Sequence, residues 1–142
     1  MPAWTTTGSD EYSRRLPRAW SWRIVEHAQA RGDTAELRKS REAAVLLDAL
    51  DARDHVVALD ERGRSHATVD VASRLEHWQS LGKSLAFVIG GPDGLDQRVH
   101  TRADELWSLS PLTFPHPLVR VLLLEQLYHA WSLNAGHPYH RE

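Results

Sequence analysis

The sequence contains no cysteine, which excludes disulfide bonds, thiolate metal ligands and cysteine nucleophiles. It also contains no apolar run of about 18 residues, the length that a membrane-spanning helix requires. The N-terminal region carries Asp10, Glu11 and several arginines where a signal peptide would have an apolar stretch. We therefore expect a cytoplasmic protein with no membrane partner.

An excess of charge of one sign is also missing, because 17 lysines and arginines stand against 19 aspartates and glutamates, a net charge of −2. No strong overall field would draw such a protein onto nucleic acid, so a phosphate partner would have to meet a local basic patch. Lys39 and Lys83 are the only lysines. Arginine suits bidentate phosphate contacts, although a codon bias toward arginine explains the count equally well.

The length of 142 residues predicts one domain over residues 1–142, since an ordinary domain has roughly 100–200 residues. Hydrophobic residues make up 42% and charged residues 25% of the chain, which is typical of globular proteins rather than of disordered or fibrous ones. No internal repeat is visible, and the prolines and glycines are not gathered into a linker.

Apolar periodicity predicts helices that alternate with strands along the chain. We expect helices from the N-cap candidates Thr5–Thr7 to just before Pro17, from the capping pair Asp33 and Glu36 to about Arg53, over 71–81 before Gly82, as a short charged helix after Gly94, and over Pro117–Leu133. We expect strands at 20–25, at 55–60 before a turn at 61–63, and at 84–89, with a brief apolar segment at 106–109. This alternation predicts an α/β fold with a mostly parallel sheet flanked by helices.

The predicted strand at 84–89 runs directly into a glycine-rich turn, Gly90-Gly91-Pro92-Asp93-Gly94. In open α/β folds, ligands bind at the carboxyl ends of strands, and glycines let the backbone approach a ligand closely. The alternative is an ordinary tight turn in which glycines supply positive φ angles. The turn matches neither the dinucleotide-binding pattern nor a P-loop, so by itself it does not identify a ligand.

Two further segments could carry chemistry. The segment Leu109–Pro117 contains three prolines among apolar residues, and it is either a rigid connector or a stiff loop that presents backbone groups to a ring-shaped ligand. The tail His137–Glu142 offers an aromatic ring for base stacking and an arginine for phosphate, although a disordered tail is the ordinary alternative. His137 and His140 lack a third ligand nearby, so we expect no metal site.

The glycine turn, the proline-containing segment and the tail resemble one family when they are taken in order. The segments that carry the resemblance are Ile89–Gly94, Trp107–Arg120, Tyr128 with Ala130–Ser132, and His137–Glu142, together with Tyr12–Arg15 near the N-terminus. They resemble the bacterial 23S rRNA pseudouridine N3-methyltransferases of the RlmH family. The resemblance extends from about Met1 to Glu142.

The resemblance implies a SPOUT-type α/β fold in which S-adenosyl-L-methionine sits in a trefoil knot formed by the C-terminal part of the chain. It places the cofactor site at Leu59, Gly90 and Gly91 and in the loop formed by Leu109, Ser110, Pro111, Leu112, Thr113 and Phe114. It also implies a homodimer that methylates N3 of a pseudouridine in the 23S rRNA of the assembled ribosome. The apolar side chains of Pro117–Leu133 cover more than one helix face, which would suit a dimer interface.

The tail residues His137, Tyr139, His140 and Arg141 are the catalytic candidates, because their side chains could orient the base, assist the loss of its proton or hold its phosphate. The sequence leaves open which of them acts as the base. The chain departs from the family by lacking its short N-terminal strand and by having His129 where arginine is usual. The main alternative function is a non-catalytic rRNA-binding module that keeps the fold, and a more distant one is a metal-dependent hydrolase built on His137 and His140.

Overall fold

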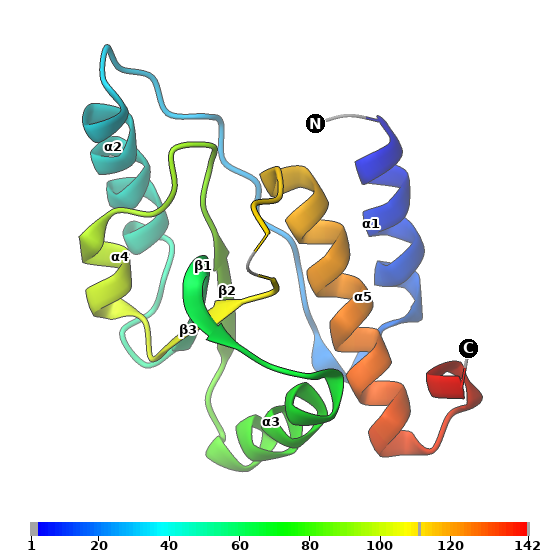
Figure 1. Cartoon of the computed structure of the whole chain (residues 1–142). Helices are drawn as coiled ribbons and strands as arrows, with labels where there is room; N and C mark the ends of the chain where they lie inside the picture. The colour runs from blue at the N-terminus through cyan, green and yellow to red at the C-terminus, as the bar shows by residue number, and fades with distance from the viewer. Residues whose placement is uncertain (1–2, 111, 142) are drawn as a thin grey trace. The chain divides into compact units, whose positions relative to one another are not determined.

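The computed structural model describes residues 3–110 and 112–141. The chain divides into two compact units, each built from separate segments of sequence (Figure 1). The sheet unit comprises Val25–Ser65 and Lys83–His116, and the helical unit comprises the described parts of Met1–Ile24, His66–Gly82 and Pro117–Glu142. Folding of the whole chain as one domain, which its length favours, stays a prediction.

The described residues of the sheet unit form three strands and two helices. The strands are β1 (His55–Ser65), β2 (Leu85–Ile89) and β3 (Glu105–Ser108), and the helices are α2 (Ala35–Asp48) and α4 (Gln97–Arg102). The strand order is β2-β1-β3, and both neighbours of β1 run parallel to it. The predicted α/β fold with a mostly parallel sheet flanked by helices is therefore confirmed.

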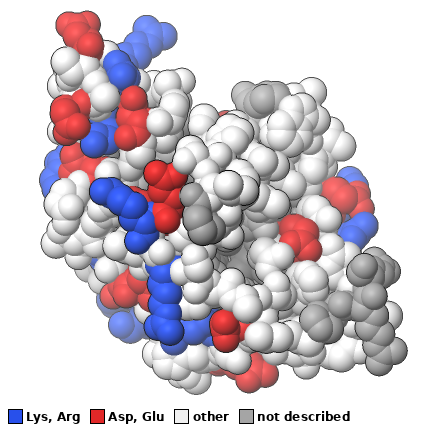
Figure 2. Space-filling model, viewed as in Figure 1, with Lys and Arg blue, Asp and Glu red and all other residues white. Residues whose placement is uncertain are grey.

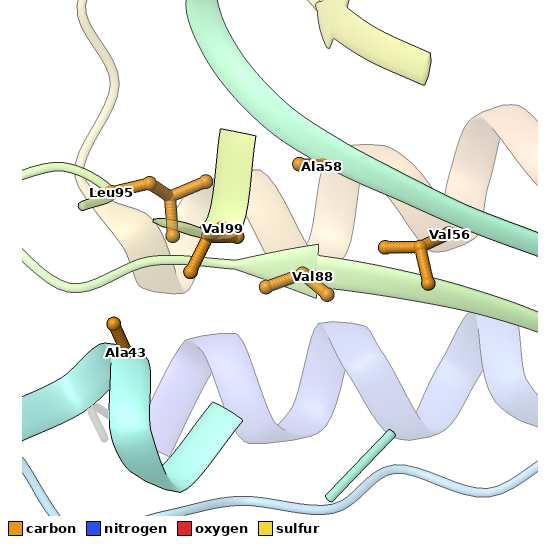
Figure 3. Close-up of a cluster of buried hydrophobic side chains, with 6 residues drawn as sticks. All are labelled: Ala43, Val56, Ala58, Val88, Leu95 and Val99. Carbon is orange, nitrogen blue, oxygen red and sulfur yellow. The ribbon is translucent and has the colours of Figure 1, made fainter. Parts of the chain in front are cut away.

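The sheet packs against α2 and α4 through a small apolar core, which Figure 3 shows. Its buried members are Ala43, Val56, Ala58, Val88, Leu95 and Val99. Val56 and Ala58 come from the apolar run at 55–60, and such a continuous run is typical of a strand that is covered on both faces. Leu95 follows the glycine turn, so the core extends to the carboxyl end of β2.

Strand β1 is longer than the sequence predicts, because it continues through the expected turn at 61–63. Its pairing with β3 is irregular there, since Leu59 and Arg64 are both opposite Trp107. A Cβ atom on Gly63 would lie between 2.6 and 2.7 Å from backbone atoms of β3. Glycine at this position therefore lets β1 return to β3 after the irregularity, and the predicted turn is a bulge within the strand.

The strand predicted at 20–25 is wrong. The structure has a short 3₁₀ helix, η1 (Arg18–Trp20), followed by Ser21 in the left-handed region and then by irregular backbone. Trp22 and Val25 would point to opposite faces of the predicted strand. Both are exposed, so neither face of the segment is buried. A strand needs a neighbour with which to pair, and in the described sheet β1, β2 and β3 pair only with one another.

The helical unit contains α1 (Ala3–Arg15), α3 (Thr68–Leu81), α5 (His116–Ala135) and a short 3₁₀ helix, η2 (Pro138–Arg141). Helices α5 and α1 approach closely, because a Cβ atom on Gly8 would lie 3.2 Å from Val121 Cγ1. Helix α5 also contacts α3, since Thr68 Oγ1 donates a hydrogen bond to Gln126 Oε1 at 2.8 Å. The long apolar helix predicted over Pro117–Leu133 is confirmed. Among the residues that the structure describes, no helix is both long and apolar enough to span a membrane.

The observed helix ends match the predicted ones where a glycine ends the helix. They differ from the predicted ones where several polar residues could begin the helix. Helix α3 ends at Gly82, which has a φ angle of +66°. Helix α2 begins after Thr34, whose Oγ1 accepts a hydrogen bond from Leu37 N at 3.1 Å, so Thr34 rather than Asp33 is the N-cap. Helix α1 already begins at Ala3, so the threonines that were expected to cap it lie within it.

Gly63 provides a test of the close contact between β1 and β3. We expect Gly63→Ala to lower the free energy of unfolding by about 1–3 kcal/mol, because the added methyl group must displace β3 backbone. Chemical denaturation followed by circular dichroism measures this change. Ser65→Ala, at an exposed position of the same strand, is the control and should leave stability unchanged. Equal stability of the two variants would contradict the contact.

Candidate functional site

Three strands meet at one point of the sheet. Leu59 of β1 is paired with Ile89 of β2 on one side and with Trp107 of β3 on the other. Because the strands are parallel, the segments that follow Ile89 and Trp107 leave the sheet at the same edge. We call this region the strand-end site. Its described members are Leu59, Gly90, Gly91, Leu109, Ser110, Leu112, Thr113 and Phe114, whereas Pro111 lies outside the described residues.

The loop after β3 is held by side-chain hydrogen bonds. Ser108 Oγ donates to the carbonyl oxygen of Ser110 at 2.8 Å, and Leu112 N donates to Ser110 Oγ at 3.0 Å. Thr113 Oγ1 donates to Glu61 Oε2 at 2.7 Å, which ties the loop to the irregular part of β1. The loop is therefore fastened to β3 and β1, two of the three strands that meet at the site.

The glycine turn has its left-handed residue at Gly94, with a φ angle of +85°. The N–H of Gly94 donates to the carbonyl oxygen of Gly91 at 3.1 Å and closes the turn. Gly90 and Gly91 do not have positive φ angles, so backbone conformation does not require glycine there. A Cβ atom would lie 2.7 Å from Leu95 Cδ2 at Gly90 and 2.7 Å from Glu42 Oε2 at Gly91. A side chain at either position would therefore have to move Leu95 or Glu42.

Helix α2 contacts the glycine turn through two charged side chains. Arg38 Nε and Nη2 donate to the two carboxylate oxygens of Asp93 at 2.8 and 3.2 Å, which lowers the pKa of Asp93 below its ordinary value. Gly91 N donates to Glu42, with Oε1 at 3.2 Å and Oε2 at 3.1 Å. Burial raises the pKa of Glu42, although the Gly91 N–H opposes this rise. The position of the turn therefore depends on α2.

A carboxylate follows Leu59 directly in β1. Asp60 accepts a hydrogen bond from the backbone N–H of Arg62 at 2.8 Å and lies 2.7 Å from His100 Nε2 of α4. Burial raises the pKa of Asp60, but the hydrogen bonds from Arg62 and His100 outweigh burial, and the pKa lies below its ordinary value. Asp60 therefore joins β1 to α4 and keeps its negative charge beside the strand-end site.

A glycine motif sets the direction of the C-terminal tail. Gly136, with a φ angle of +70°, donates its N–H to the carbonyl oxygen of Leu133 at 3.3 Å. His137 N donates to the carbonyl oxygen of Ser132 at 2.8 Å, and the two bonds together form a Schellman motif that ends α5. His137 Nδ1 then accepts the N–H of Tyr139 at 3.1 Å. The first tail residues are thus placed by backbone and side-chain hydrogen bonds.

Tyr139 packs among aromatic and charged side chains of the helical unit. Its ring centroid lies 4.7 Å from that of Tyr128 and 5.3 Å from that of His129. Its hydroxyl group donates to Glu125 Oε1 at 3.1 Å and lies 3.4 Å from the hydroxyl group of Tyr12. Burial, the Tyr12 hydroxyl and the negative charge of Glu125 raise the pKa of Tyr139, so the phenol is protonated at neutral pH. Tyr139 therefore donates the hydrogen bond that fixes the tail to α5.

The neighbours of Tyr139 also contact one another, and we call the group the tail-docking cluster. Its members are Tyr12, Arg15, Glu125, Tyr128, His129 and Tyr139. The Arg15 guanidinium lies 5.8 Å from the ring centroid of Tyr128 and 5.9 Å from that of Tyr139. His129 Nδ1 lies 3.2 Å from Glu125 Oε1, the same oxygen that accepts the Tyr139 hydrogen bond. His129 is therefore part of the cluster that holds the tail.

The structure places the two groups of predicted site residues in different units. The strand-end site belongs to the sheet unit, whereas His137 and Tyr139 belong to the helical unit. The side chains of His140 and Arg141 lie outside the described residues. Among the side chains that are described, no group of three or more histidines, aspartates and glutamates is arranged to hold a metal ion.

Three glutamates outside the sequence motifs each contact a predicted site residue. The pairs are Glu42 with Gly91, Glu61 with Thr113, and Glu125 with Tyr139. The first two pairs are 49 and 52 positions apart in the sequence, so no local pattern could reveal them. Glu125 does have a signal, because a single acidic residue within a long apolar helix needs a polar partner where it is partly buried.

The whole chain is similar to proteins of one family. It matches the family described as "Predicted SPOUT methyltransferase" over residues 1–140. Ribosomal RNA large subunit methyltransferase H of Thioalkalivibrio sulfidiphilus is 51% identical over 145 residues, which cover 100% of this chain and 93% of the relative. The proteins of the same name from Chromohalobacter salexigens and Hahella chejuensis are 49% and 46% identical, over 99% and 100% of this chain and 93% of each relative. The resemblance predicted from the sequence is confirmed, and the chain belongs to the SPOUT methyltransferase family.

Proposed function

We propose that this protein is a cytoplasmic, S-adenosyl-L-methionine-dependent rRNA methyltransferase that methylates N3 of a pseudouridine in the 23S rRNA of the assembled ribosome. The observation that carries the proposal is the register at Leu59, which brings three separate segments of sequence to one strand-end site. The family match and the relatives named ribosomal RNA large subunit methyltransferase H support the reaction and the class of substrate.

The strand-end site fits a cofactor that has a flat ring and a polar tail. It combines the backbone of the glycine turn with apolar side chains, from the buried Leu59 to the exposed Leu112. Apolar groups with a few main-chain donors and acceptors are typical of small-molecule sites. When it is bound, S-adenosylmethionine supplies an activated methyl group. The residues that would hold it are Leu59, Gly90, Gly91 and the loop from Leu109 to Phe114, and the trefoil knot implied by the family resemblance is part of the proposal.

The chain's own task in methyl transfer is to position the base and to assist the loss of its proton. Tyr139 is protonated at neutral pH and donates to Glu125, so we assign it to docking the tail rather than to accepting that proton. His137 uses Nδ1 to accept the N–H of Tyr139. We therefore assign contact with the base and its phosphate to His140, Arg141 and Nε2 of His137.

The surface charge favours recognition of rRNA by local contacts. Figure 2 shows basic and acidic side chains interspersed on the face in view, rather than a broad area of one sign. Several arginines are paired with carboxylates within the sheet unit, for example Arg38 with Asp93 and Arg62 with Asp60. Sequence-independent attraction to phosphate is therefore weak, and the proposed substrate is the assembled ribosome, whose shape can add contacts that isolated RNA lacks.

The hydrogen bond between Thr113 and Glu61 tests the cofactor site. We expect S-adenosylmethionine to bind the wild-type protein, and Thr113→Val to weaken binding by about two- to tenfold, because the loop loses a bond to β1. Isothermal titration calorimetry measures both affinities. Thr101→Val is the matched control, since Thr101 bonds the carbonyl oxygen of Gln97 within its own helix. An unchanged affinity of Thr113→Val would remove this loop from the site.

The tail is tested by transfer of labelled methyl groups from S-adenosylmethionine to unmodified ribosomes. We expect the wild-type protein to methylate them, and the double variant His140→Ala/Arg141→Ala to be slower by about 100-fold at unchanged cofactor affinity. Tyr139→Phe should lower the free energy of unfolding by about 1 kcal/mol, because it loses the bond to Glu125. Full transfer by the double variant would refute the catalytic role of His140 and Arg141. Cofactor binding without transfer by the wild-type protein would instead indicate a non-catalytic rRNA-binding module.

Helix α5 provides the test of the proposed homodimer. Leu118, Val119 and Leu122 in its N-terminal half are only half-buried in the single chain, and we propose that they contact a second copy. Sedimentation equilibrium at micromolar concentration should then give twice the 16.1 kDa mass of one chain. Val119→Asp should shift the mass toward that of the monomer, whereas Val69→Asp, at an exposed position of α3, should not. A wild-type monomer would contradict the dimer.

A further inference from the structure

Helix α2 carries two charged side chains, Arg38 and Glu42, that lie one helical turn apart and contact the same segment. Arg38 donates to both carboxylate oxygens of Asp93 at 2.8 and 3.2 Å, and its Nη1 donates to the carbonyl oxygen of Gly32 at 3.0 Å. Glu42 accepts the N–H of Gly91, with its oxygens 3.1 and 3.2 Å from the nitrogen. The two contacts therefore link α2 to successive parts of the glycine turn.

The α2 side of the turn is filled by the chain itself. A Cβ atom on Gly91 would lie 2.7 Å from Glu42 Oε2, and one on Gly90 would lie 2.7 Å from Leu95 Cδ2 and 3.4 Å from Glu42 Oε1. Leu95 belongs to the apolar core shown in Figure 3. The Gly91 N–H is thus directed toward α2 and already has an acceptor there.

Glu42 keeps this position against an electrostatic cost. Burial raises the pKa of Glu42, the Gly91 N–H lowers it, the negative charge of Asp93 raises it, and His116 lowers it. Arg38 and Lys39 line the same small cavity as Glu42, so cations are also near. A half-buried carboxylate is retained at such a place when it satisfies a backbone donor that would otherwise be unpaired.

We propose that Glu42 is a positioning residue for cofactor binding. Its carboxylate accepts the Gly91 N–H and, together with the Arg38–Asp93 pair, holds the glycine turn in the conformation to which the cofactor binds. The inference rests on the proposed function, since the turn belongs to the strand-end site. It assigns the Gly91 N–H to the protein's own structure, so other atoms of the turn hold the cofactor. A side chain added at Gly91 would accordingly displace Glu42.

Hydrogen exchange of the Gly91 amide, followed by NMR, measures this contact without the cofactor. In Glu42→Ala we expect the amide to exchange about tenfold faster than in the wild-type protein, because its acceptor is lost. In Glu42→Gln the side-chain oxygen still accepts, so the exchange rate should rise less. The amide of Val57, in the buried part of β1, reports global opening and should exchange equally in all variants. Unchanged exchange of Gly91 in Glu42→Ala would overturn the inference.

Calorimetry with S-adenosylmethionine gives the second readout. We expect Glu42→Ala to raise the Kd about five- to tenfold while the rate of methyl transfer at saturating cofactor stays unchanged. Asp48→Ala is the control, because Asp48 is an exposed acidic residue at the C-terminal end of α2 and should affect neither quantity. Faster Gly91 exchange with an unchanged Kd would overturn the positioning role. If the wild-type protein binds no S-adenosylmethionine, the proposed function fails and the positioning role fails with it, whereas the exchange rates still show whether Glu42 holds Gly91.

Discussion

The register at Leu59 is the constraint on which the candidate site depends. Leu59 is opposite Ile89 and Trp107 at once, and this double pairing brings the glycine turn and the loop after β3 to one edge of the sheet. A slip of one residue in either pairing would turn the side chains of that strand to the opposite face. Val56 and Val88 are buried in the same core and oppose such a slip. The strand register that packs the core is therefore the same register that assembles the site.

Carboxylates hold the segments that border the site and the tail. The pairs are Glu42 with the Gly91 N–H, Glu61 with the Thr113 hydroxyl, Asp60 with His100, and Glu125 with the Tyr139 hydroxyl. A carboxylate has two oxygens that can each accept hydrogen bonds, so one side chain can serve a backbone donor, a hydroxyl group or an imidazole. In each pair the acid lies on a helix or strand and the partner lies on another element. The acids thus fix the two loops, helix α4 and the tail to residues of α2, β1 and α5.

Local patterns predicted the elements whose signals are independent of distant partners. The apolar runs at 55–60 and 84–89 form buried strands, and the helix that stops at Gly82 ends where glycine adopts a left-handed conformation. The alternation at 20–25 failed because a strand also needs a pairing partner. The expected turn around Gly63 failed because the same residues form a bulge in which the β3 backbone leaves no room for a Cβ atom at Gly63.

The sequence by itself determined the family of this protein and, through that resemblance, the residues of the candidate site. Only the tertiary structure decided which of these residues meet, because the contact of Leu59 with both neighbouring strands depends on parallel register. It also decided that Glu42 holds Gly91 and that Tyr139 is a protonated donor to Glu125. These facts arise from burial and from contacts between helices, strands and loops, and a local sequence pattern encodes neither.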